Sequence, residues 1–327
     1  MYQKILKYMV ACFIIYQVIM MLSGISGFIY KHFLTIPLNL YSRYGADSWV
    51  CITGSSSGQG RQFALKFAEK GFNIVLIGSK RIKSVEKEIQ EKSGVKVISI
   101  IKNFCDAYKD DFFDDIIEVF DKIDLSVLIN NVGHRTAWIP YHEMPKEYIR
   151  NTIMVGTMVQ CRLIQLVIPK FLQRNKDKGV KSAIVNMTAQ CMHTNIGFGM
   201  SNEISVPYMS VYEATNAFGF YHSNSVYQEY KHHKSLDFLT ITPGAIVTEN
   251  TQYLSDTIFS ISADKYVDNI LRLMGNVNGI HNAHYGHSLS TVLINFAPFT
   301  KDKILKKVGY NIANNIMENT ARLDYSV

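Results

Sequence analysis

The chain has 327 residues, of which 47% are hydrophobic and 19% charged, with a formal net charge of +7. This apolar content is enough for a complete core and argues against an intrinsically disordered chain. The basic residues are spread along the sequence without a cluster interleaved with aromatics, which disfavours nucleic acid as a partner. The five widely spaced cysteines are typical of a reduced compartment rather than of a disulfide scaffold.

The N-terminal region contains a long uncharged run. Residues 8–30 form 23 consecutive positions without a charge, which as a helix would be about 34 Å long and would cross a hydrocarbon core of about 30 Å. A buried core helix or a cleaved signal peptide would usually show a shorter run. We therefore expect a membrane anchor and linker over residues 1–44, with the lipid bilayer as a partner. Lysines flank both ends, so the orientation stays open.

A strand, a glycine-rich turn and a helix follow in that order. The apolar residues Trp49 to Ile52 are typical of a buried parallel strand, and Thr53 to Gly60 contain three glycines before a helical pattern. Glycine permits the tight turn, and a helix N-terminus attracts a pyrophosphate. The segment predicts a dinucleotide cradle, with an ordinary glycine- and serine-rich loop as the alternative.

The end of the next strand bears on which dinucleotide is bound. A second strand, Asn73 to Ile77, leads into Gly78-Ser79-Lys80-Arg81, without the acid that would hold a ribose 2′-hydroxyl. Two adjacent cations suit a 2′-phosphate, so the sequence favours NADP(H). Two solvated charges at a helix start are the alternative.

Taken together, these motifs resemble the short-chain dehydrogenase/reductase family. The resemblance is carried by the glycine turn at 53–60, Asn103 after the third strand, Asn130-Asn131-Val132-Gly133, and Pro243-Gly244-x-x-x-Thr248. The segments VLINNVG, LIQLVIPKF and VYEATNAF look like the membrane-bound group of very-long-chain 3-oxoacyl-CoA reductases and 17β-hydroxysteroid dehydrogenases. The implied fold class is α/β: a single doubly wound parallel-sheet Rossmann-type domain over 45–290, after an N-terminal transmembrane helix. A helical membrane-proximal tail is expected over 291–327.

The resemblance also implies which residues hold the cofactor. The expected set contains the glycine turn, the β-strand exits and the late loop: Thr53, Gly54, Ser56, Gly58, Gln59, Gly60, Ser79, Lys80, Arg81, Asn103, Asn130, Gly133, Tyr212, Pro243, Gly244 and Thr248. Asn103 would lie near the adenine, and the Pro243–Thr248 loop would hold the nicotinamide amide. Gln59 departs from the usual aliphatic residue.

The catalytic positions depart from the family pattern. Family members use a Tyr proton donor, a Lys four residues later, a Ser and an Asn. Here Tyr212 is kept, whereas Asn216, Ala189 and Gly156 stand at the Lys, Ser and Asn positions. No Lys or Arg occurs between Lys181 and Lys231, so no shift of alignment restores the cation.

Some local substitutes are conceivable near these positions. They are the hydroxyls of Thr188 and Ser201, and a charge or proton carrier at His134 or Arg135. An insertion of about ten residues, around Cys191 to Ser205, is expected beside the cleft. The spacing of His281, His284 and His287 suggests a metal, but no Cys or clustered carboxylate accompanies it, so no metal site is predicted.

Two functions remain open. The first is a catalytically inactive NADP(H)-binding subunit, structural or regulatory, of a membrane assembly with protein partners. The second is an active NADPH-dependent reductase of a lipid-like ketone, such as a 3-oxoacyl-CoA or 17-ketosteroid. The resemblance implies the endoplasmic reticulum, with the mitochondrial inner membrane as the alternative.

Overall fold

The computed structural model describes residues 2–134, 138–190, 194–196, 200–202, 206–248, 255–295 and 307. Seven parallel strands form one sheet in the order β11-β8-β5-β4-β1-β2-β3. Their bounds are β1 Trp49–Thr53, β2 Asn73–Gly78, β3 Val97–Ile101, β4 Leu125–Asn130, β5 Ser182–Met187, β8 Leu236–Ile241 and β11 Gly279–His281. Chain order reverses at β1, between β2 and β4, as in doubly wound folds, and ligands bind such sheets beyond the strand ends at the reversal.

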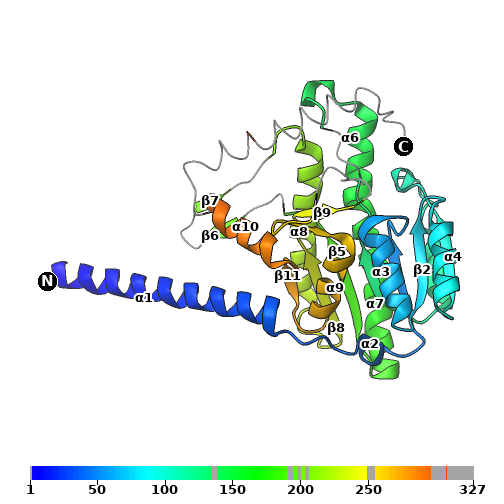
Figure 1. Cartoon of the computed structure of the whole chain (residues 1–327), viewed down its shortest axis with the longest axis horizontal. Coiled ribbons are helices and arrows are strands. Elements are labelled where there is room, and N and C mark those ends of the chain that lie inside the picture. Colours follow the sequence, from blue (N-terminus) through cyan, green and yellow to red (C-terminus); the bar gives the residue numbers. More distant parts are fainter. Residues whose placement is uncertain are drawn as a thin grey trace.

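Helices cover both faces of this sheet (Figure 1). One face carries α3 Gly58–Glu69, α4 Ile82–Lys92 and α9 Ala263–Leu273, and the other carries α5 Asp114–Lys122, α7 Val159–Lys178 and α8 Ser210–Tyr230. Successive strand residues supply the two layers alternately: Val50 and Ile52 join one core cluster and Cys51 joins the other. Because both faces of the sheet are buried, consecutive residues of a central strand must all be apolar.

The remaining elements lie at the ends and edges of the sheet. They are the short helices α2 Leu40–Tyr44, η2 Phe104–Asp106, η3 Tyr141–Glu143, α6 Lys146–Ile153 and α10 Tyr285–Asn295, the π-helical turns η1 Tyr30–Leu34 and η4 Met154–Met158, the antiparallel pair β6 Thr194–Ile196 and β7 Met200–Asn202, and the parallel pair β9 Ala245–Val247 and β10 Ser260–Ser262. The expected insertion beside the cleft thus contains the β6–β7 pair, and most of the tail expected over 291–327 lies outside the described residues.

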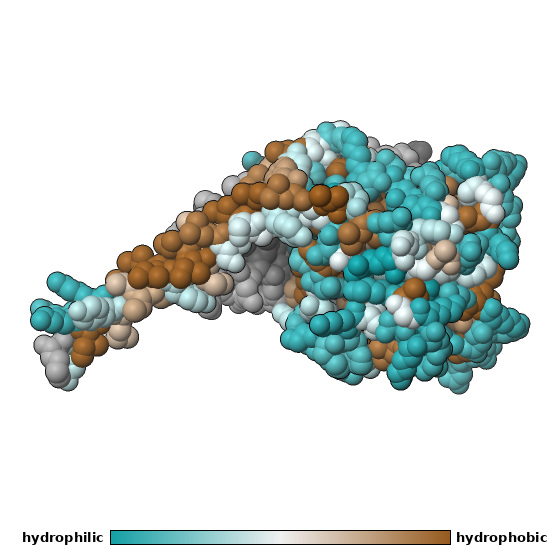
Figure 2. Space-filling model, turned by 90° about the horizontal axis from the view of Figure 1, so that it is seen from below, coloured by the Kyte–Doolittle hydropathy of each residue, from teal (hydrophilic) through white to brown (hydrophobic). Residues whose placement is uncertain are grey.

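The anchor is a single exposed helix, α1 Tyr2–Ile29, which projects from the domain (Figures 1 and 2). Its apolar surface reaches the domain without interruption in Figure 2. Two helical stretches are long and apolar enough to cross a membrane: 2–34, none of which is buried in its most apolar window, and 146–178. The second contains α7, which packs in the core against β4 and β5, so α1 is the candidate span.

The segment predicted as a linker contains a short helix that packs against the domain. Within residues 37–45, α2 buries Leu40 and Tyr44, and the Tyr44 hydroxyl donates to the buried carboxylate of Asp237 at 3.0 Å. Arg43 donates to both oxygens of the same carboxylate, at 2.6 and 3.0 Å. The start of the domain is therefore joined to β8 by a partly buried ion pair.

Candidate active site

The glycine turn after β1 is shaped by close contacts with the end of β4. Gly54 and Gly58 have φ values of +65° and +54°, a region that favours glycine. A Cβ at Gly60 would overlap the Gly54 carbonyl oxygen. The backbone N–H groups of Asn131 and Val132 donate to Thr53 Oγ1 at 3.0 and 3.1 Å. These contacts hold the glycine turn against the end of β4. The turn is the segment that the sequence predicts as the dinucleotide cradle.

The first turn of α3 offers backbone donors at the mouth of this turn. Ser57 is the N-cap, and its side chain makes no capping hydrogen bond. The first N–H groups of a helix have no partner within the helix, so they are suited to a phosphate.

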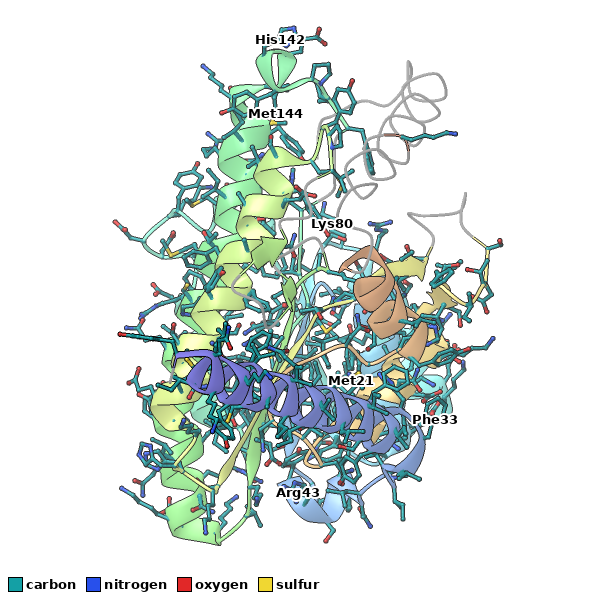
Figure 3. The ribbon with its side chains drawn as sticks, turned by 90° about the vertical axis from the view of Figure 1, so that its left-hand side faces the viewer. Met21, Phe33, Arg43, Lys80, His142 and Met144 are labelled. Carbon is teal, nitrogen blue, oxygen red and sulfur yellow. The ribbon has the colours of Figure 1, made fainter. Side chains whose placement is uncertain are left out.

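The predicted adenosine residues lie at the ends of β2 and β3. Ser79, Lys80 and Arg81 are exposed (Lys80 is labelled in Figure 3), and neither cation has an ion-pair partner among the residues that the structure describes. The side-chain oxygen Asn103 Oδ1 accepts from the Cys105 N–H at 3.2 Å and caps η2. Lys80 and Arg81 are therefore available to a phosphate, whereas that Asn103 oxygen is already used.

A cavity of about 260 Å³ opens beyond the strand ends, at the chain reversal. It brings together most of the residues predicted for the nicotinamide end and the catalytic positions; these are Gln59, Asn130, Gly133, Gly156, Ala189, Tyr212, Asn216, Pro243, Gly244 and Thr248. No Asp, Glu, Lys or Arg is among its described lining residues. The wall is therefore polar but carries no formal charge.

The side chain at the Lys position lines the cavity and is hydrogen-bonded to its own helix. Asn216 Nδ2 donates to the Tyr212 carbonyl oxygen at 2.9 Å, one turn back along α8. Thr215 Oγ1 donates to the same oxygen at 2.8 Å. Asn216 is therefore held by its own helix, and it brings no cation to Tyr212.

The positions expected to hold Ser and Asn are closely packed. Ala189 is buried, and the neighbouring Thr188 hydroxyl donates to the Ile241 carbonyl oxygen at 3.0 Å. Gly156 lies in the π-helical turn η4, where a Cβ would be 2.7 Å from the Cβ of Thr215. The Thr188 hydroxyl is therefore already used as a donor to the backbone. The close approach of η4 to α8 leaves no room for an Asn at position 156.

His134 also lines the cavity but is held as a neutral group. Its Nδ1 lies 2.9 Å from Thr152 Oγ1, and burial lowers the pKa of the imidazole. A buried neutral imidazole does not replace a fixed cation. Arg135 and the side chain of Ser201, the other candidate substitutes, lie outside the described residues.

A buried chain of amides and a hydroxyl lies beneath the cavity, and sequence reasoning did not find it. Asn130 Nδ2 donates to Asn186 Oδ1 at 2.9 Å, and Asn186 Nδ2 and Gln160 Nε2 donate to Ser223 Oγ at 3.0 and 2.8 Å. These residues come from four elements, so only the tertiary fold brings them together. Their spacing in the sequence gives no signal.

Two acceptors on the cavity wall are buried without a hydrogen-bond partner among the residues that the structure describes. They are Gln59 Oε1 and Asn130 Oδ1. A buried unpaired acceptor costs about 1–3 kcal/mol, so both oxygens fit a ligand that donates N–H or O–H groups. The carboxamide and ribose hydroxyls of a nicotinamide nucleotide are such donors. Together with the glycine turn, these acceptors show that the residues present fit the cofactor.

The late histidines support the loop at Pro243–Thr248 and the chain around it. His287 Nδ1 accepts from the Gly244 N–H at 3.1 Å, and its Nε2 donates to the Ala245 carbonyl oxygen at 3.2 Å. His284 and His281 donate to the carbonyl oxygens of Ile258 and Asn278. Each imidazole therefore has a backbone role, and His287 supports the loop that the sequence assigns to the nicotinamide.

Comparisons with known proteins agree with this architecture. The profile of the short chain dehydrogenase family matches residues 48–258. A very-long-chain 3-oxoacyl-CoA reductase of Rattus norvegicus is 28% identical over 69% of this chain and 68% of its own length. A reductase of that name from Caenorhabditis elegans is 24% identical, over 92% and 91%. The human 17-beta-hydroxysteroid dehydrogenase type 3 is 26% identical, over 67% of this chain and 66% of its own length.

Solved structures share the fold. A 7beta-hydroxysteroid dehydrogenase superposes with a TM-score of 0.67 at 19% identity, covering 82% of this chain and 98% of its own. A short-chain dehydrogenase from Sphingobium yanoikuyae in complex with NADPH superposes with a TM-score of 0.58 at 24% identity, covering 72% and 87%. The matched profile spans well over half of the sequence and includes the glycine turn and Tyr212. The chain belongs to the short chain dehydrogenase family.

Proposed function

We propose that this chain is a membrane-anchored, NADP(H)-binding member of the family that does not reduce ketones and acts as a structural or regulatory subunit of a membrane assembly. The observation that carries the proposal is Asn216, a neutral side chain bonded to its own helix at the position of the family's Lys. The resemblance to the reductase group favours the endoplasmic reticulum as the location, and protein partners are part of the proposal.

The physical argument concerns the acidity of a phenol. A free tyrosine has a pKa of about 10. An ammonium about 4 Å from a phenolate would stabilise it by about 4 kcal/mol at an effective dielectric constant of about 20, which corresponds to about three pKa units. Without a nearby cation, a phenol is a poor general acid near neutral pH, because its pKa lies far above the pH of the reaction. Among the described lining residues, none carries a formal charge.

Cofactor binding is retained in this proposal as a contribution to stability. When bound, the dinucleotide would supply hydride in an active relative. Here the glycine turn, Lys80 and Arg81 would bind its phosphates, and Gln59 and Asn130 would accept hydrogen bonds from its nicotinamide end. A ligand that binds only the folded state stabilises it by linkage. NADP(H) is therefore proposed as a lasting structural ligand.

The preference for NADP(H) has its own test. Charge reversal in Lys80→Glu/Arg81→Glu should weaken NADP(H) binding to the full chain in nanodiscs, and should leave NAD(H) binding little changed. Lys83→Glu/Lys87→Glu, at exposed lysines one turn further along α4, is the matched control. Equal affinity of the parent for both nucleotides would contradict the preference.

The decisive experiment measures NADPH oxidation by the full chain in nanodiscs, with a very-long-chain 3-oxoacyl-CoA or a 17-ketosteroid. We expect no turnover in the parent. Asn216→Lys/Ala189→Ser should create activity that Tyr212→Phe removes, whereas Asn216→Met/Ala189→Ser, similar in length but neutral, should not. Turnover by the parent that disappears in Tyr212→Phe would overturn the proposal.

That outcome would favour the second candidate, an active reductase of a lipid-like ketone. It is supported by the names of the relatives above and by the position of Tyr212 on the cavity wall.

A further inference from the structure

The base of the anchor helix is locked to the domain by hydrogen bonds. Arg272, at the end of α9, donates to the carbonyl oxygens of Lys31 and His32 at 3.3 and 3.0 Å. Buried His32 lies 3.0 Å, through its Nε2, from Ser288 Oγ on α10. Asn276 donates to the Ile36 carbonyl oxygen at 2.9 Å. The helix therefore leaves the domain at a fixed place and not through a flexible tether.

Exposed apolar side chains surround this exit. We call them the exit patch, which consists of Phe33, Leu34, Ile36, Ile258, Phe259 and Tyr285. Phe33 is 62% and Tyr285 is 39% exposed. Their ring centroids are 6.2 Å apart, and the Ile258 carbonyl accepts from His284, the residue before Tyr285. Three segments distant in the sequence thus contribute to one apolar surface.

The depth of the anchor brings this surface to the bilayer. The uncharged run at 8–30 is about 34 Å long against a hydrocarbon core of about 30 Å, so its last residue reaches the interface. Phe33 follows three residues later, at the base of α1 (Figure 3). Aromatic residues are favoured at the level of the lipid headgroups.

A cation, Arg272, lies next to the exit patch. A cavity of about 700 Å³ beside the patch is lined by Phe33 and Tyr285 and by the charged residues Arg272, Lys265, Asp256 and Asp268. The acids in its wall already have partners: Asp256 pairs with Lys265 at 2.9 Å and Asp268 with Lys66 at 2.8 Å. Arg272 has no carboxylate partner within the described part of the chain. This charge is complementary to lipid phosphates.

We propose that the exit patch is a membrane-docking surface, on which the domain rests with these side chains at the boundary of headgroups and acyl chains and with Arg272 facing lipid phosphate. The occupant is the bilayer and not a protein, because the patch is continuous with the anchor. The rigid junction leaves the domain one orientation, so that exposed apolar area is removed from water when the anchor inserts.

The test uses added tryptophans in the full chain, reconstituted in nanodiscs of phosphatidylcholine and phosphatidylserine with or without brominated acyl chains. Phe259→Trp and Tyr285→Trp report on the patch. Met20→Trp reports on the anchor, and Tyr108→Trp, which follows β3 at the opposite edge of the sheet from β11, is the exposed control. The parent, with its two native tryptophans, gives the baseline.

We expect the emission added at positions 259, 285 and 20 to be quenched by brominated lipid, and that at 108 to be unaffected. In an Ile258→Asp/Phe259→Asp background, quenching at 285 should fall while quenching at 20 persists. Unfolding midpoints in the same nanodiscs confirm that each variant is folded. Quenching at 20 without quenching at 259 and 285 would overturn the proposal and would leave the patch to a protein partner. Absence of quenching at 20 would overturn it as well, because the anchor itself would then lie outside the bilayer.

Discussion

The close approach of η4 to α8 gives a prediction with a magnitude. A Cβ at Gly156 would lie 2.7 Å from the Cβ and 2.8 Å from the Oγ1 of Thr215. Carbon atoms pack best at about 3.5–4.0 Å, so Gly156→Ala forces the helices apart by about 1 Å. Overpacking of this kind costs about 1–3 kcal/mol. The usual helical gain from Gly to Ala, about 0.5–1 kcal/mol, offsets only part of it. We expect Gly156→Ala to destabilise the domain by about 1–2 kcal/mol.

A double-mutant cycle isolates the contact. Thr215→Gly removes the opposing Cβ and costs about 1 kcal/mol as a helical glycine. The swapped variant, Gly156→Ala/Thr215→Gly, should be more stable than the sum of the two changes by about 1–3 kcal/mol. Urea unfolding of the full chain in detergent, followed by tryptophan fluorescence, measures each corner. Additive effects, or a Gly156→Ala variant as stable as the parent, would refute the close approach and with it the reason why an Asn does not fit.

Three further predictions concern the same site. Burial and the neighbouring His284 lower the pKa of His287 to about 4, so this residue binds fewer protons in the folded state than in the unfolded state. Its contribution to the free energy of unfolding, about 3 kcal/mol, is present above pH 6.5 and is lost as the pH falls toward 4. His287→Gln should flatten that part of the stability–pH curve, and an unchanged curve would contradict the assignment. Burial raises the pKa of Glu213 to about 7, so the pH dependence of its contribution to stability is the opposite of that of His287. The contribution is full below about pH 4.5 and is lost as the pH rises through 7. Glu213→Gln should remove this loss of stability, measured by urea titrations at several pH values. Gly60→Ala should abolish dinucleotide binding measured by calorimetry, because the added methyl overlaps the Gly54 carbonyl oxygen; binding at the parent's affinity would show that the turn is not the cradle.

The parts of the fold that depend on local pattern could be predicted from the sequence. The strand expected at Trp49 to Ile52 extends to Thr53, and that at 73–77 extends to Gly78, because uninterrupted apolar runs bounded by turn residues identify buried parallel strands. The family, the glycine turn and the neutral residue at 216 could also be predicted, because each depends on a fixed spacing of residues in the sequence. The roles of the cofactor residues stay predictions.

The parts that depend on distant contacts could not be predicted. Gln160 and Ser223 are 63 positions apart and meet only because α7 and α8 pack side by side. The support of Gly244 by His287 joins residues 43 positions apart. The segment at 37–45 looked like a linker because its polar residues give no period, yet Tyr44 is fully buried by its contact with Asp237. Tertiary packing overrides local composition at such places.

The two buried acceptors without a donor on the cavity wall, Gln59 Oε1 and Asn130 Oδ1, have a consequence for the abundance of this protein in a cell. An acceptor that stays without a donor costs about 1–3 kcal/mol, which is to be compared with a typical folding margin of about 5–15 kcal/mol. A change of about 1–2 kcal/mol alters abundance several-fold through proteolytic quality control. If the nucleotide binds as proposed, newly made copies that obtain it would outlast those that do not, and the steady-state amount of this chain would follow the local supply of the nucleotide.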